Sequence, residues 1–189
     1  CANGAILYDL MNDKVLEEWL MPIDIQIQIV NNLRKNLPGI NFAIEYEEEF
    51  HREKEYTTRW DIGLDNIGVD LIEEKMVRPA FKMLGRCGNN EFTSDQMLEI
   101  AARELQGIAN ITHSNSSESL IEISALGVSK GETLAKMAER AGLTSADCVS
   151  FGDNPNDFSM LQWTDRSWAM SDGHPDGPKY AKFVAQAHY

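Results

Sequence analysis

The sequence predicts an α/β protein in which an α+β region, about residues 8–124, precedes a Rossmann-like region with a parallel sheet. Two observations support this prediction. Residues 40–84 contain short apolar stretches broken by charge and glycine, as expected of strands joined by loops. From residue 129 a capped helix, an apolar strand, a loop and a second helix follow one another. That alternation is typical of a parallel sheet with helices on its faces.

The composition is that of an ordinary globular protein. The chain has 189 residues, 43% of them hydrophobic and 25% charged, and its net charge is −13 from 30 acidic and 17 basic side chains. The electrostatic field of this negative net charge repels nucleic acid and anionic membranes. No apolar run is long enough to span a bilayer. We therefore expect neither kind of partner. A site for phosphate esters would need local positive charge, from a metal ion or a placed lysine.

The three cysteines are widely spaced and form no metal-binding pattern with one another or with histidine. An odd number at such spacing indicates reduced thiols, so we expect a cytoplasmic protein without disulfides. The N-x-S/T sequences at Asn110 and Asn115 are then expected to remain unglycosylated.

Periodicity predicts the elements ahead of the alternating region. Residues 22–37 fit both a strand and a helix, and we favour a helix because the run is long for a strand. Residues 80–84 and 119–124 predict strands. Between them, Thr93 and Gln96 fit a capping box that begins a helix with one apolar face.

The helix expected at 129–141 begins with Ser-Lys-Gly-Glu, in which Ser129 and Glu132 fit a second capping box. Lys130 then lies in the first turn, where its charge faces the positive end of the helix dipole at a cost of about 0.3–1 kcal/mol. An anion beside Lys130 would reverse this cost. The alternative is a solvated surface lysine.

The apolar strand at 148–151 runs into the loop Gly-Asp-Asn-Pro-Asn-Asp at 152–157. Ligands of open parallel sheets bind at the carboxyl ends of strands. A turn at this point would bring Asn156 and Asp157 back toward Asp153. Hard oxygen ligands of this kind suit Mg²⁺, which takes only one or two protein carboxylates.

The loop has two other interpretations. An Asx-rich turn that caps the next helix remains open. A calcium-binding EF-hand loop is excluded, because Pro155, Phe158 and Thr164 stand where that loop needs an oxygen ligand, glycine and glutamate.

Two stretches together resemble the Cof-like branch of the haloacid dehalogenase superfamily. They are the helix start Gly-Val-Ser-Lys-Gly at 127–131 and the strand end Gly-Asp-x-x-Asn-Asp-x-x-Met-Leu at 152–161. Residues 3–5, Asn-Gly-Ala, look like the point at which family chains leave the core for the cap. Residues 169–176 look like the family's Ala-Met-x-Asn-Ala stretch, with Gly173 in place of a common alanine.

The resemblance implies a partial Rossmann-like core, with helices on both faces of a parallel sheet, and an α+β cap. Residues 1–7 would begin the hinge from core to cap. Residues 8–124 would form the cap that selects the substrate, and residues 125–189 the second half of the core.

The resemblance also implies roles for four side chains in a Mg²⁺-dependent phosphatase of small phosphorylated metabolites of the sugar-phosphate kind. Lys130 would hold the substrate phosphate, and Asp153 would be a direct Mg²⁺ ligand. Asn156 would help to fix the phosphate. Asp157 would orient Lys130 or a metal-bound water, so Lys130 should contact Asp157 and face the same pocket as Asp153. The reaction would pass through an aspartyl-phosphate.

The chain departs from the family pattern at the nucleophile. The family's D-x-D-x-T motif occurs nowhere in the sequence, and neither does its Thr or Ser before Gly-Arg. We interpret the chain as a fragment, a whole cap with the second half of a core, that is inactive by itself. A P-type ATPase shares a related loop but would need membrane helices. A phosphomutase or sucrose-phosphatase relative and a non-catalytic binding module remain as alternatives.

Two further features are predicted to be structural. One is a basic cluster of His51, Arg52, Lys54 and Arg59. It could bind a second anionic group of the substrate, but we favour a solvated loop whose positive charges offset the acidic side chains at 47–49. His174 is expected to be structural or exposed, not catalytic.

Overall fold

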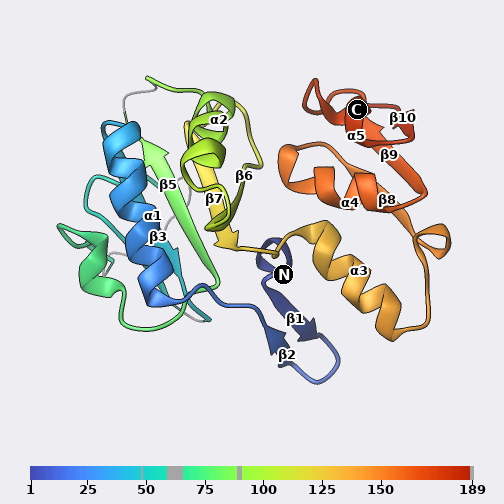
Figure 1. Cartoon of the computed structure of the whole chain (residues 1–189), viewed down its shortest axis with the longest axis horizontal. Helices are drawn as coiled ribbons and strands as arrows, with labels where there is room; N and C mark the ends of the chain where they lie inside the picture. Colours follow the sequence, from blue (N-terminus) through green and yellow to red (C-terminus); the bar gives the residue numbers. More distant parts are fainter. Residues whose placement is uncertain (48, 59–65, 89–90, 188–189) are drawn as a thin grey trace.

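The computed structural model describes residues 1–47, 49–58, 66–88 and 91–187. Its elements gather around one antiparallel sheet and one parallel sheet, with a two-stranded hairpin near the N-terminus (Figure 1). We call residues 23–125 the antiparallel unit and residues 130–185 the parallel unit. No helix in the described part of the chain has the length and apolar character that a membrane span requires.

The antiparallel unit is built on a five-stranded sheet in the order β4-β3-β5-β7-β6, in which every neighbouring pair is antiparallel. Its strands are β3 (Ile40–Glu45), β4 (Phe50–Arg52), β5 (Lys82–Cys87), β6 (Ala109–Thr112) and β7 (Leu120–Ala125). Helices α1 (Ile23–Asn36) and α2 (Ser94–Glu104) lie on the same face of this sheet (Figure 1), and a 3-10 turn, η2 (Ile72–Lys75), precedes β5.

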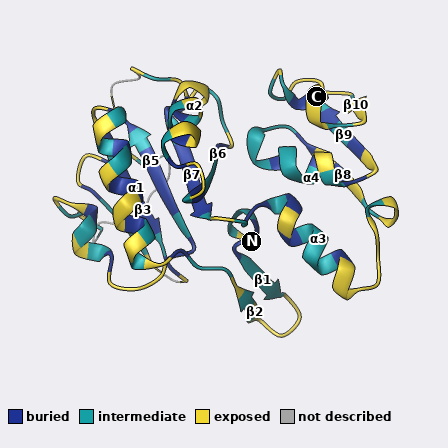
Figure 2. Ribbon diagram, in the orientation of Figure 1, coloured by how far each residue is buried: buried dark blue, intermediate teal, exposed yellow. Residues whose placement is uncertain are grey.

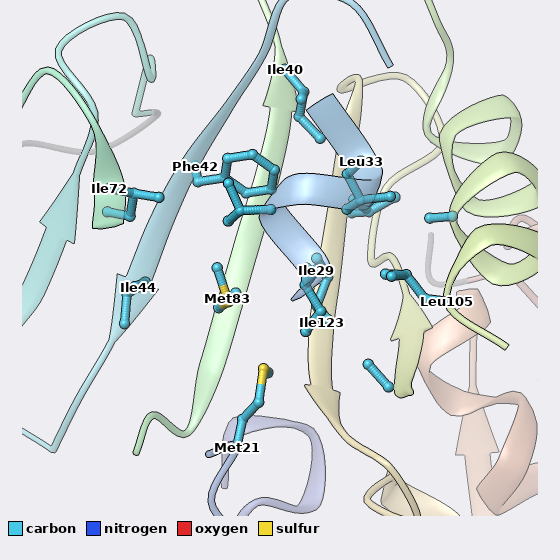
Figure 3. Close-up of a cluster of buried hydrophobic side chains, with 14 of the residues drawn as sticks. Met21, Ile29, Leu33, Ile40, Phe42, Ile44, Ile72, Met83, Leu105 and Ile123 are labelled. Carbon is cyan, nitrogen blue, oxygen red and sulfur yellow. The ribbon is translucent and has the colours of Figure 1, made fainter. Parts of the chain in front are cut away.

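Helix α1 confirms the helical interpretation of residues 22–37. Ile29, Leu33 and Leu37 repeat every four residues, and all three are fully buried. A strand would place Ile27 on the same face as Ile29, yet Ile27 is 42% exposed. Figure 3 shows Ile29 and Leu33 packed with side chains of the central strands. Burial of one helical face therefore decides the ambiguity.

Helix α2 begins at the predicted capping box. Thr93 Oγ1 accepts the Gln96 N–H at 3.2 Å, and Gln96 Oε1 accepts the Thr93 N–H at 2.9 Å. The predicted strand at 119–124 is β7. The strand predicted at 80–84 begins later, because Ala80 pairs with Met21 in an isolated bridge. Figure 2 shows buried positions along β5 and β7, the strands at the middle of the sheet.

The N-terminal residues form a short 3-10 turn, η1 (Ala2–Gly4), and a hairpin of β1 (Ile6–Asp9) and β2 (Lys14–Glu18) that the sequence did not predict. This segment packs on the parallel unit. The Thr133 hydroxyl donates to the Gly4 carbonyl at 2.8 Å, and Arg140 pairs with Glu17. The boundary expected between residues 7 and 8 falls within β1, and the division into domains stays a prediction.

The parallel unit confirms the alternation predicted from residue 129. Its sheet has the order β10-β9-β8, with both pairs parallel. Its elements are α3 (Lys130–Arg140), η3 (Ser145–Asp147), β8 (Val149–Gly152), η4 (Pro155–Asp157), α4 (Phe158–Trp163), β9 (Arg166–Met170), α5 (Gly177–Tyr180) and β10 (Phe183–Ala185). At the start of α3 the Ser129 hydroxyl accepts the Glu132 N–H, which is one half of the expected box.

Helices were expected on both faces of this sheet, and for the described residues that expectation is wrong. Helices α4 and α5 pack against β8 and β9. On the other face Val149, Phe151 and Phe183 are each about half exposed. There the rings of Phe151 and Phe183 stack on opposite sides of Trp168, with centroid distances of 5.2 and 5.1 Å. Alternation along β8 therefore separates a covered face from an uncovered one.

We predict that Gly131→Ala destabilises the chain. A Cβ at Gly131 would lie 2.4 Å from the backbone carbonyl of Ser159, where α3 meets α4. Alanine is the better helix former by about 1 kcal/mol, but overlap with backbone costs more, so the free energy of unfolding should fall by about 1–2 kcal/mol in urea titrations. Gly88→Ala is the control, because a Cβ there meets no atom of the described residues within 4 Å. Equal unfolding midpoints for the two variants would contradict the prediction.

Candidate functional site

The site is built where β8 ends. Strand β8 runs to Gly152, and the chain then turns through η4 into α4. A Cβ at Gly152 would lie 2.4 Å from the Cβ of Asp157. Glycine at this position therefore lets the Asp157 side chain fold back over the end of the strand. The turn brings Asp157 close to Asp153, as the sequence predicted.

Asp157 is the most constrained side chain of this loop. It is 5% exposed, and its Oδ1 accepts a hydrogen bond from Lys130 Nζ at 2.5 Å. Its Oδ2 accepts the backbone N–H groups of Asp153 and Asn154 at 3.1 and 3.3 Å. One buried carboxylate thus fixes both the loop and the first-turn lysine of α3, and the predicted contact between Lys130 and Asp157 is confirmed.

Asp153 has one oxygen available to a ligand. Its Oδ2 accepts the Asn154 side-chain N–H at 2.7 Å, whereas its Oδ1 takes no hydrogen bond from any residue that the structure describes. The side chain is half-buried, next to the fully committed Asp157. A half-buried carboxylate oxygen at a strand end fits one ligand position of a Mg²⁺ ion, which keeps several waters beside one or two carboxylates.

Lys130 and Asn156 line a cavity of about 470 Å³ between the two units, together with Asn3, Thr112, Ser129 and Gln162 among others. Asp153 and Asp157 are not among its lining residues, so this cavity is not the shared pocket expected for Lys130 and Asp153. Asp157 connects the two residues instead, because it accepts hydrogen bonds from the Lys130 amine and from the backbone N–H of Asp153. The Asn156 N–H donates to the His113 carbonyl at 3.2 Å, which ties the loop to the antiparallel unit.

The basic cluster is held by local partners. Lys54 pairs with Asp70 at 2.6 Å, and His51 Nε2 lies 2.8 Å from Glu49. Arg52 donates to backbone carbonyls, and Arg59 lies outside the described residues. These partners favour the interpretation of a loop that balances its own charges over a second anion site.

Sequence reasoning missed two groupings of residues that are distant along the chain. Glu122, on β7, accepts hydrogen bonds from Asn3 and Ser114 at 2.6 Å and from Lys82 at 3.2 Å. Burial by itself would raise the pKa of Glu122, but Lys82 and these donors outweigh it and hold the pKa below its usual range. No local sequence pattern could have predicted this network, because Asn3 and Lys82 lie far along the chain from Ser114 and Glu122.

The second missed grouping contains His174. Its Nε2 lies 2.9 Å from Asp95 Oδ1, and His113 Nε2 lies 2.8 Å from the same oxygen. His174 is thus held in the structure, as expected, although the sequence named neither partner.

Comparison with known proteins gives the family. The whole chain, residues 1–189, matches the family model described as haloacid dehalogenase-like hydrolase. The chain belongs to this family. The resemblance inferred from the helix start at 127–131 and the strand end at 152–161 is therefore confirmed.

Curated relatives of this haloacid dehalogenase-like chain are phosphatases. It is 26% identical over 187 residues to 5-amino-6-(5-phospho-D-ribitylamino)uracil phosphatase YcsE of Bacillus subtilis, covering 99% of this chain. It is 27% identical over 186 residues to pyridoxal phosphate phosphatase YbhA of Escherichia coli, covering 90% of this chain. The alignments span 66% and 65% of the lengths of these relatives.

Solved structures share the fold. SMU.1108c from Streptococcus mutans UA159 matches with a TM-score of 0.78 at 22% identity, over 97% of this chain and 69% of that one. The subclass IIB sugar phosphatase BT4131 matches with a TM-score of 0.73 at 19% identity, over 97% of this chain and 68% of that one. At these identities the likeness shows the α/β fold of the haloacid dehalogenase-like hydrolases over part of their length.

We predict that Asp157→Ala lowers the free energy of unfolding of the chain by about 2–4 kcal/mol, because it removes an acceptor that serves Lys130 and two backbone amides. Chemical denaturation measures the loss. Asp165→Ala is the matched control, since Asp165 is exposed and its side chain accepts no hydrogen bond from the described residues. The assignment of a structural role to Asp157 fails if the two variants unfold at the same denaturant concentration.

Proposed function

We propose that the complete protein is a Mg²⁺-dependent phosphatase of small phosphorylated metabolites. The observation that carries this proposal is the contact of Lys130 with Asp157 beside Asp153, at the carboxyl end of a strand in a parallel sheet. It joins a cation suited to phosphate and a carboxylate oxygen suited to a hard metal ion. Its place in the fold is where open α/β sheets bind ligands.

Each side chain has a defined part in this proposal. Lys130 neutralises charge on the phosphate, and Asp157 fixes the position of the Lys130 amine. Asp153 holds the metal ion, and Asn156 hydrogen-bonds the phosphate from the cavity side. When bound, Mg²⁺ would add positive charge to that of Lys130, in a chain whose net charge is −13. Preorganised charge of this kind is the main contribution that a protein makes to phosphoryl transfer.

The division of labour between the two units is part of the same proposal. The cap that selects the substrate (8–124) would contain most of the antiparallel unit. The second half of the core (125–189) would contain the parallel unit, and residues 1–7 would begin the hinge. The curated relatives are named for a ribityl-uracil phosphate and for pyridoxal phosphate, and one structural neighbour for sugar phosphates. Each of these names refers to a small phosphorylated metabolite, and we propose a substrate of that class for the complete protein.

The nucleophile of the proposed reaction lies outside these residues. The chain contains no D-x-D-x-T motif, so the carboxylate that forms the aspartyl-phosphate must come from elsewhere in the complete protein. The same requirement separates the phosphatase from the non-catalytic binding module, which would need no such carboxylate. A cytoplasmic location, without nucleic-acid or membrane partners, stays a prediction.

We predict that Asp153→Ala in the complete protein abolishes Mg²⁺-dependent hydrolysis of phosphate esters, because it removes the carboxylate assigned to the metal. The measurement is the initial rate at several Mg²⁺ concentrations with a panel of phosphorylated metabolites. Asp165→Ala, which changes an exposed carboxylate of the same unit, should keep the wild-type rate and Mg²⁺ dependence. An Asp153→Ala protein that keeps both would remove the metal assignment.

We also predict that chain 1–189 by itself does not hydrolyse these esters at an enzymatic rate. Displacement of a reacting group by 1 Å can cost about a hundredfold in rate, and here the nucleophile is missing altogether. Purified chain is assayed with Mg²⁺, and the Lys130→Ala variant serves as the control for contaminating phosphatases. Robust turnover that disappears in Lys130→Ala would show that the proposed mechanism is wrong.

A further inference from the structure

One carboxylate connects the two units beside the candidate site. Asp95 lies in the first turn of α2. Its Oδ1 is within hydrogen-bond distance of two ring nitrogens, His113 Nε2 at 2.8 Å and His174 Nε2 at 2.9 Å. His113 follows β6 in the antiparallel unit, whereas His174 lies between β9 and α5 in the parallel unit. The His113 side chain is fully buried and that of His174 is 10% exposed.

The backbones of the same two histidines hold the loop at 153–157. The His174 N–H donates to the Asp153 carbonyl at 2.6 Å, and the His113 carbonyl accepts the Asn156 N–H at 3.2 Å. A Cβ at Gly173 would lie 2.6 Å from the Asp153 carbonyl oxygen, so the backbone before His174 also rests directly on the loop. Asp95 is thus connected to Asp153 through His174 and to Asn156 through His113.

The three ligand atoms lie within 4.8 Å of one another, a spacing that a metal ion could also use. The other ring nitrogens decide against this. His174 Nδ1 accepts the Asp176 N–H at 3.1 Å, so it carries a lone pair and the ring proton is on Nε2. A metal ion bound to Nε2 would require the ring proton on Nδ1. That proton would then face the Asp176 N–H, which is itself a donor.

The His113 ring leads to the same conclusion. Its Nδ1 is buried and has no hydrogen-bond partner among the described residues. A proton moved to Nδ1 by metal binding would become a buried donor without an acceptor, whereas metal-bound histidines normally donate from their second nitrogen. Burial raises the pKa of Asp95, but the hydrogen bonds from His113 and His174 outweigh it and keep this carboxyl ionised. An ionised Asp95 therefore provides a hydrogen-bond acceptor for the Nε2–H groups of both His113 and His174.

We propose that Asp95 is a positioning residue for the loop at 153–157. Through His113 and His174 it holds that loop against the antiparallel unit, and so sets where Asp153 and Asn156 stand relative to Lys130. The consequence for catalysis rests on the proposed function. The structural part of the proposal, that Asp95 holds the loop in place, does not depend on the proposed function. It can be measured in chain 1–189.

The test is amide hydrogen exchange of chain 1–189, followed by NMR, in wild type, Asp95→Ala and Asp24→Ala. Asp24 is the matched control, because it is the second residue of α1 as Asp95 is of α2, and it makes no hydrogen bond with the described residues. Loss of the shared acceptor should make the Asn156 and His174 amides exchange about tenfold faster in Asp95→Ala, which corresponds to about 1.4 kcal/mol of easier opening. Asp24→Ala should leave both amides at their wild-type rates.

A merely local effect on α2 gives a different pattern. If Asp95 only stabilises its own helix, exchange should rise within α2 and not at Asn156 or His174, and that outcome overturns the proposal. Asp95→Asn keeps the shape and one acceptor oxygen, so it should fall between wild type and Asp95→Ala. This variant preserves the test if Asp95→Ala does not fold.

Two spectroscopic readouts separate this role from metal binding. Long-range ¹H–¹⁵N spectra should show His113 and His174 with the proton on Nε2. Addition of Zn²⁺ to the wild-type chain should leave these signals in place. Proton-bearing Nδ1 atoms, or saturable Zn²⁺ binding that Asp95→Ala removes, would overturn the proposal in favour of a metal site.

In the complete protein, Asp95→Ala should lower kcat about tenfold or more while KM changes less, because the loop is misplaced in the bound complex. Asp95→Asn should restore part of kcat. A complete wild-type protein without phosphatase activity would contradict the proposed function and leave the exchange result standing. An active protein whose kcat is unchanged in Asp95→Ala would contradict the positioning role alone.

Discussion

The carboxylate of Asp157 joins the two elements on which the candidate site depends. It is buried at the end of β8, where it accepts Lys130 from the start of α3 and two amides from its own loop. A lysine in the first turn of a helix is unfavourable without an anion. A buried carboxylate is unfavourable without a cation or donors. Each group therefore offsets the cost of the other. Beside them, Asp153 Oδ1 accepts no hydrogen bond from the residues that the structure describes.

Local sequence rules predicted the parts of the fold that local physics determines. The capping box at Thr93, the helical face beginning at Ile29 and the turn after Gly152 all appear as expected. The hairpin at residues 6–18 was missed, because its strands are short and partly exposed. The uncovered face of β8 was also missed, since a sequence pattern shows which side chains are apolar and not what covers them.

The site was predicted in part for the same reason. Lys130 and Asp157 are separated by 27 residues, but each stands at a recognisable strand or helix end, so their meeting could be inferred. The links of Asp95 to His174 and of Asn3 to Glu122 span 79 and 119 residues, and no periodicity marks their members. Such contacts depend on how the two units meet.

The proposed roles make Lys130 and Asp153 neighbours of one bound phosphate. A crystal structure of the complete protein with Mg²⁺ and a phosphate analogue such as vanadate tests these roles most directly. We expect an Asp153 oxygen about 2.0–2.1 Å from the metal ion, with Lys130 Nζ in hydrogen-bond contact with both Asp157 and the analogue. A metal ion held away from Asp153, or a Lys130 amine that points to solvent while the analogue is bound, would contradict these roles.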